Sequence, residues 1–177
     1  GVYFENVIPG YRTLYVSGRE MIETEITDLS TEIMDGSRYR RKRYKPRTIT
    51  VGYQLIAKSN AEFRNAYNKL NSLLDVAEAK LIFLDEPDKY YVGTKVNAGD
   101  VPHGRNAITA EIEFYCADPF KYSVEEYEVA PTADDGTTFV VDYKGTYKAH
   151  PTFEAVMENG ENGFIGFVDQ DKHILQF

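Results

Sequence analysis

The side chains that most often perform catalytic or metal chemistry are few in this chain and stand far apart. His103, His150 and His173 have no second histidine or cysteine at the spacing of a metal site, so we interpret them as surface or turn residues. Cys116 is the single cysteine and falls on the apolar side of a strand pattern, which favours an inert buried thiol over a nucleophile. The sequence also lacks a Gly-x-Ser-x-Gly elbow and a P-loop. We therefore predict no metal ion and no cofactor.

Carboxylates supply the remaining catalytic candidates. Glu111 with Glu113, or Glu125 with Glu128, could form an acid/base pair, and the acidic residues within 85–88 could bind a cation. Nothing in the sequence indicates a pocket or a raised pKa around the glutamates, and residues 85–88 lack the spacing of a calcium loop. Exposed strand residues and a solvated turn explain these groups better. We predict no catalytic residue and no enzyme, with glycan hydrolysis kept as a third hypothesis.

The most distinctive local feature is a basic segment interleaved with tyrosines, Ser37 to Arg47. Its cationic residues are Arg38, Arg40, Arg41, Lys42, Arg43, Lys45 and Arg47. Three interpretations remain open. The segment could pair phosphates and stack bases of a nucleic acid, it could be a solvated basic hairpin, or it could be an arm that contacts a neighbouring subunit. Arginine forks bind carboxylates in a bidentate manner, and a β-arm can extend a sheet edge, which supports the third interpretation.

The charge distribution also favours self-association. The chain has 20 basic and 28 acidic residues, a net charge of −8, which opposes general attraction to nucleic acid. Residues 36–61 contain no acidic residue and eight basic ones, so the rest of the molecule carries −16. A basic strip on one copy could therefore meet an acidic face on the next.

Hydrophobic periodicity predicts a mainly β fold of the α+β class. Residues Asn106 to Cys116 and Thr48 to Leu55 alternate apolar and polar side chains with the period of two of half-buried strands. One amphipathic helix interrupts the strands, because Phe63 to Ala77 carries an apolar stripe at helical spacing. Ser59 and Glu62 have the spacing of a capping box at its start. No stretch is long and apolar enough to span a membrane, so this segment is not expected to insert into one.

Turn signals divide the chain into parts. Residues 85–88 separate two apolar runs and predict a hairpin, and strands are also expected around Glu125 to Glu128, Pro151 to Met157 and Phe164 to Val168. Two Asn-Gly dipeptides, at 159–160 and 162–163, indicate tight turns. We predict an N-terminal domain over residues 1–122, a linker or strand over 123–136, and a partial β-domain over 137–177.

The order of these features resembles the distal tail protein (Dit) family of long-tailed bacteriophages. The resemblance depends on Leu81 to Tyr91, which reads LIFLDEPDKYY, and on Phe114 to Tyr122, which reads FYCADPFKY. Residues Met34 to Val51 and the capped helix lie in the matching order. The motif residues are Asp85, Pro87, Asp118, Pro119 and Phe120.

The resemblance implies a structural virion protein of a phage or prophage. Members form a six-subunit ring at the distal end of the tail, from a β-sandwich or barrel-like domain with one helix and a protruding hairpin. The ring joins the tail tube, the tape-measure protein and the tail-tip or baseplate proteins, and its channel lets DNA pass in transit. It would be assembled in the cytoplasm of the bacterial host. We place the intersubunit arm at the basic segment, from Arg38 to Arg47.

Residues 137–177 fit this resemblance only in part. Many relatives carry a galectin-like or carbohydrate-module-like sandwich after the Asp-Pro-Phe point, and residues 137–177 resemble its opening strands but are too few to close one. The first methionine is Met21, so we expect a fragment of a longer chain. The alternative function is a β-rich module that binds nucleic acid through Arg38 to Arg47, or carbohydrate through its 14 tyrosines.

Overall fold

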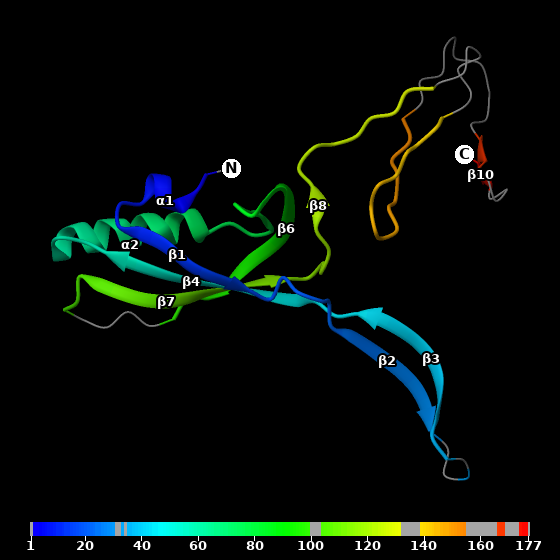
Figure 1. The fold of residues 1–177 in the computed structure, drawn as a ribbon, viewed down its shortest axis with the longest axis horizontal. Helices are drawn as coiled ribbons and strands as arrows, with labels where there is room; N and C mark the ends of the chain where they lie inside the picture. The colour runs from blue at the N-terminus through cyan, green and yellow to red at the C-terminus, as the bar shows by residue number, and fades with distance from the viewer. Residues whose placement is uncertain are drawn as a thin grey trace. The chain divides into compact units, whose positions relative to one another are not determined.

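The computed structural model describes residues 2–30, 33, 35–99, 104–131, 139–154, 166–168 and 174–176. Most of the regular structure in these residues is β-strand, so the prediction of a mainly β fold is confirmed (Figure 1). The chain divides into two compact units, residues 1–127 and 128–177.

The first unit is built on an antiparallel sheet. Its strand order is β1-β4-β7-β6-β5. The short strand β8 pairs with Lys89 and Tyr90 of β6, ahead of the part of β6 that pairs with β7. The bounds are β1 Tyr11–Ser17, β4 Arg47–Ile56, β5 Ala79–Phe83, β6 Glu86–Asn97, β7 Ala107–Cys116 and β8 Tyr122–Ser123. Two further strands, β2 (Thr24–Ser30) and β3 (Ser37–Tyr44), form a separate hairpin, which is inserted in the sequence between the paired strands β1 and β4. This hairpin projects away from the sheet (Figure 1).

The centre of the sheet confirms the two strands with the clearest alternation. β4 and β7 pair without interruption from Arg47 opposite Cys116 to Ile56 opposite Ala107. Side chains of one face are buried, among them Ile49, Leu55 and Ile112, each at most 1% exposed. Cys116 lies on this face and is fully buried, as its position in the pattern predicts. Burial raises the pKa of its thiol, which keeps the sulfur protonated and unreactive.

One helix covers the buried face of the sheet. α2 spans Asn60–Leu74, and its buried residues Phe63, Ala66, Leu70 and Leu74 join the same core as the sheet. Ser59 is the N-cap and its Oγ accepts a hydrogen bond from the Glu62 amide at 3.2 Å, as predicted. The Glu62 carboxylate accepts from the amide of Lys58, at 3.1 Å, rather than from that of Ser59. The helix ends earlier than the apolar stripe indicates. Ala77 lies beyond it, because the chain leaves the helical conformation at Asp75 and reaches a left-handed turn at Glu78, with φ of 51°.

A short helix that the sequence pattern did not indicate lies beside the outer strand. α1 spans Phe4–Val7, and the Glu5 carboxylate accepts a hydrogen bond from the backbone amide of Thr13 in β1 at 3.1 Å. The pairing of β1 with β4 shifts between Thr13 and Tyr15, which makes a β-bulge at Leu14. The outer edge of β1 is therefore interrupted by a side chain and by an irregular residue.

The hairpin predicted around residues 85–88 is confirmed by the pairing of β5 with β6, but the length of its turn and a later strand differ from expectation. The turn within residues 85–88 is shorter than expected, because Glu86 already pairs with Phe83 and β6 contains both Pro87 and Asp88. Leu84 and Asp85 alone make the loop. No strand is present around Glu125 to Glu128. Pairing with β6 ends at Ser123, and the closely spaced glutamates that follow would repel one another along a strand.

The second unit contains little regular structure in its described part. β9 (Gly166–Val168) and β10 (Ile174–Gln176) form an antiparallel pair, and residues 139–154 contain no helix or strand. The expected strand from Pro151 to Met157 is absent over 151–154, and its remainder lies outside the described residues. Both Asn-Gly dipeptides also lie outside them. β9 occupies the described end of the strand expected over Phe164 to Val168.

Candidate functional site: the basic hairpin and its base

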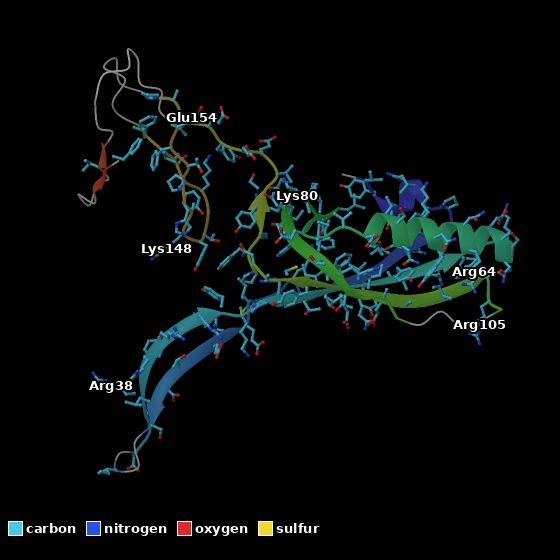
Figure 2. All side chains as sticks on the ribbon, turned by 180° about the vertical axis from the view of Figure 1, so that it is seen from behind. Arg38, Arg64, Lys80, Arg105, Lys148 and Glu154 are labelled. Carbon is cyan, nitrogen blue, oxygen red and sulfur yellow. The ribbon has the colours of Figure 1, made fainter. Side chains whose placement is uncertain are left out.

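The basic segment forms one strand of the projecting hairpin. Arg38, Arg40, Arg41, Lys42 and Arg43 all lie in β3 and are exposed. β3 pairs only with β2 in the described residues, so both outer edges of the hairpin lack a neighbouring strand there. Figure 2 shows Arg38 on the part of the hairpin distant from the sheet, with Arg64 and Arg105 at the opposite end of the first unit. The hairpin is thus accessible on its faces and along its edges.

A β-bulge divides the hairpin side chains between two faces. Thr27 pairs with Arg41 and Asp28 with Tyr39, so Arg40 is an extra residue in β3. Strict alternation would place Tyr39 on the face of Arg41, whereas the extra residue shifts it to the other face. One face accordingly carries Arg38, Arg41 and Arg43. The opposite face carries Ile26, Tyr39, Lys42 and Tyr44, with the Lys42 ammonium 5.2 Å from the centre of the Tyr44 ring.

β2 and the residue directly before it supply acidic partners that sequence reasoning missed. The Arg43 guanidinium contacts Glu25 at 2.6 Å, and the Lys45 ammonium contacts Glu23 at 3.2 Å. Arg41 donates to the hydroxyl of Thr27 at 3.4 Å. Residues 23–45 hold six basic and five acidic residues, so the whole hairpin carries a net charge of only +1. The alternation of Glu23 and Glu25 just before a basic strand was the signal that could have revealed this pairing.

Arg47 differs from the other six basic candidates because it lies in the sheet. It is the first residue of β4, and its guanidinium donates to the carbonyl oxygens of Gly18 at 3.2 Å and Glu20 at 3.4 Å. The same group lies over the Tyr91 ring at 5.3 Å. Arg47 therefore contacts the segment that leads from β1 into the hairpin.

We call the junction of the hairpin with the sheet, residues 18–22 and 44–47, the base of the hairpin. Two motif residues from the family resemblance, Asp85 and Phe120, contact this base. Asp85, in the β5–β6 turn, accepts two hydrogen bonds from the Arg19 guanidinium, at 2.8 and 2.5 Å. This bidentate contact lowers the pKa of Asp85 and raises that of Arg19. Pro87 is exposed in β6, two residues further along.

The second motif lies next to the first, because the Lys121 ammonium contacts the Glu86 carboxylate. Asp118 accepts a hydrogen bond from the Phe120 amide at 2.9 Å and another from the Tyr122 hydroxyl. Pro119 between them is buried. This Asx turn directs the Phe120 ring toward β3, where it packs edge-on against Tyr44 with the ring centres 5.4 Å apart.

The glutamates considered as acid/base pairs lie beside an open hollow or are exposed. Glu111 and Glu113 lie on the sheet face opposite α2, beside an open hollow of about 360 Å³. Glu111 accepts a hydrogen bond from the hydroxyl of Tyr15, whose ring lies over Gly52. Glu125 and Glu128 are exposed. Across the described residues, no three His, Cys, Asp or Glu side chains gather as metal ligands would, and no helix could span a membrane.

Comparisons with known proteins agree with this architecture. Residues 8–116 match the family model of the phage tail protein RIFT-related domain. The crystal structure of the SPP1 Dit protein, described as a paradigm of the hub adsorption apparatus in phages that infect Gram-positive bacteria, is similar with a TM-score of 0.60 and 25% identity. The similarity covers 70% of this chain and 51% of that one, so the chain spans about half the length of this relative. No curated protein sequence matches. The chain belongs to the phage tail protein RIFT-related domain family, and its fold and sequence make it a tail protein of the Dit type.

Proposed function

We propose that this chain is a structural subunit of a tail hub that assembles into a six-membered ring through its projecting hairpin. The observation that carries the proposal is a two-faced hairpin with both outer edges unpaired in the described residues. A ribbon of this kind can add to the sheet of a neighbour or lie across it. The Dit resemblance gives the proposal its location, the distal end of the virion tail.

The proposed partners are other copies of the chain, the tail tube, the tape-measure protein and the tail-tip or baseplate proteins. DNA would pass through the ring without being retained, because the net charge of −8 opposes its binding. The role proposed here is architectural and requires no catalysis and no cofactor. Residues 128–177 would begin a second β-domain, which corresponds to the partial domain expected over 137–177.

Local contacts within the hairpin refine the choice of arm residues. Arg43 and Lys45 already have carboxylate partners in the same hairpin, and Arg47 lies at the base. Four exposed basic residues of the hairpin have no carboxylate partner among the described residues. Arg41 donates to the Thr27 hydroxyl, which leaves Arg38, Arg40 and Lys42. We assign these three the principal intersubunit contacts.

Light scattering after size exclusion tests the proposal. We expect a mass near six times 20.2 kDa for the assembled protein. Changing Arg38, Arg40 and Lys42 together to Glu should reduce the mass toward that of one chain. Changing Arg64, Lys69 and Arg105 to Glu introduces the same charge difference outside the hairpin and should leave the oligomer intact. An oligomer that survives the hairpin substitutions would remove these residues from the interface.

The nucleic-acid alternative predicts a different result. The same hairpin variant would lose affinity for DNA while the mass stays unchanged. Because β2 neutralises part of β3, the structure offers fewer free cations to phosphates than the sequence indicates.

A further inference from the structure

The hairpin is connected to the sheet by two short segments, and each segment is held by a contact to a distant part of the chain. The incoming segment, between β1 and β2, contains Arg19, whose guanidinium is bound by Asp85 and lies over the Phe83 ring at 4.6 Å. The outgoing side ends at Tyr44, which packs against Phe120. These contacts come from the β5–β6 turn and from the turn after β7. One attachment point lies on the incoming connection, and the other lies at the end of β3, directly before the outgoing connection.

Three further features limit movement at the base. Gly18 leaves β1 with φ of 85°, and a Cβ on it would lie 2.1 Å from the carbonyl oxygen of Thr48, so the chain turns tightly against β4. The Arg47 guanidinium holds the carbonyl groups of Gly18 and Glu20. The Nε atoms of Arg19 and Arg47 are buried without a hydrogen-bond partner among the described residues, so both guanidinium groups are packed into the base.

We propose that Arg19, Asp85 and Phe120 are positioning residues that fix the direction in which the hairpin leaves the sheet. A ribbon held at both connections cannot rotate about either one alone. The Dit-like motif residues Asp85 and Phe120 then act on the arm from outside it, through Arg19 and Tyr44. If the hairpin is the assembly arm proposed above, an arm that is already oriented loses less conformational entropy when it meets a neighbour.

The direction of the hairpin is tested in the isolated chain, independently of any ring. Spin labels are attached at Arg40→Cys in β3 and Thr109→Cys in β7, and electron–electron double resonance gives the distribution of distances between them. Cys116 is fully buried and is not labelled in the folded protein. A dilute sample of the hairpin-charge variant Arg38→Glu and Lys42→Glu, at low salt so that the Arg19–Asp85 pair is not screened, is used after light scattering has confirmed the mass of one chain.

We expect one narrow distance distribution in the parent protein and a clearly broader one in Asp85→Ala and in Phe120→Ala. Asp88→Ala is the matched control for Asp85→Ala, because it removes an exposed carboxylate only three residues away. Asp88 pairs with Lys89 and not with the hairpin connections, so its loss should leave the distribution narrow. Arg19→Asp combined with Asp85→Arg should narrow it again by restoring an ion pair. Thermal unfolding of each variant checks that the domain remains folded. If Asp85→Ala does not fold, Arg19→Lys replaces it, because a lysine cannot make the bidentate contact with Asp85.

A broad distribution in the parent protein, or an unchanged one in both Asp85→Ala and Phe120→Ala, would overturn the inference. A parent protein that never forms a ring would contradict the proposed function while leaving the distance measurement decisive for the positioning residues.

Discussion

Cross-strand ion pairs in the hairpin set a quantitative limit on how the protein interacts with polyanions. If all seven basic residues contacted duplex DNA, a plot of the logarithm of the binding constant against the logarithm of the salt concentration would have a slope of about −6.3. Arg43 and Lys45 have carboxylate partners, and Arg47 is held at the base by backbone carbonyl groups. Arg38, Arg40, Arg41 and Lys42 remain, which gives a slope of about −3.6. Between 50 and 200 mM salt the affinity should therefore fall about 150-fold rather than about 6,000-fold.

Releasing the paired cations should steepen this dependence. In the double variant Glu23→Gln and Glu25→Gln, Lys45 and Arg43 become available, and the slope should reach about −5.4. Fluorescence anisotropy of a labelled duplex, titrated at several salt concentrations starting near 20 mM, measures both slopes. Glu125→Gln with Glu126→Gln changes the net charge equally, away from the hairpin, and should leave the slope near its parent value. A parent slope near −6, or no steepening in the hairpin variant, would refute the neutralisation argument.

Three further predictions concern the first unit. Burial raises the pKa of Tyr11 and of Tyr53 to about 12. The stability that their neutral phenols contribute is therefore complete below about pH 10 and should be lost as the pH rises through 12. Thermal unfolding and phenolate absorbance measure this loss. Ser59→Ala should cost about 1 kcal/mol, or about 4 °C in Tm for a unit of this size, whereas Ser72→Ala at an exposed position within α2 should cost nothing. Cys116 should react with a thiol reagent only at the rate of unfolding, and fast reaction in the native protein would contradict its burial.

Elements with strong local signals were predictable from the sequence. The central strands β4 and β7 alternate regularly because one face of each is buried, and α2 combines an apolar stripe with a capping serine. The position of the helix end was less predictable, because Asp75 and the left-handed Glu78 override an apolar stripe that continues to Ala77. Local periodicity cannot report where a tertiary turn interrupts it.

The candidate site was predictable in composition but not in arrangement. Seven basic residues identify the segment, yet their electrostatic effect depends on which strand pairs with β3 and in which register. The bulge at Arg40 moves Tyr39 to the opposite face, and a single extra residue leaves little trace in a pattern of basic residues and tyrosines. Contacts such as Arg19 with Asp85 join residues 66 positions apart, and a single sequence does not reveal such pairs.

The interrupted edge of β1 has a consequence for the product of self-association. An open sheet edge accepts any extended strand, and repeated acceptance produces filaments of indefinite length. In this protein the Glu5 carboxylate occupies the amide of Thr13, and the bulge at Leu14 breaks the regular row of backbone groups beside it. This edge is thus a poor template for polymerisation, and growth of an assembly along β1 is suppressed before any specific contact is made.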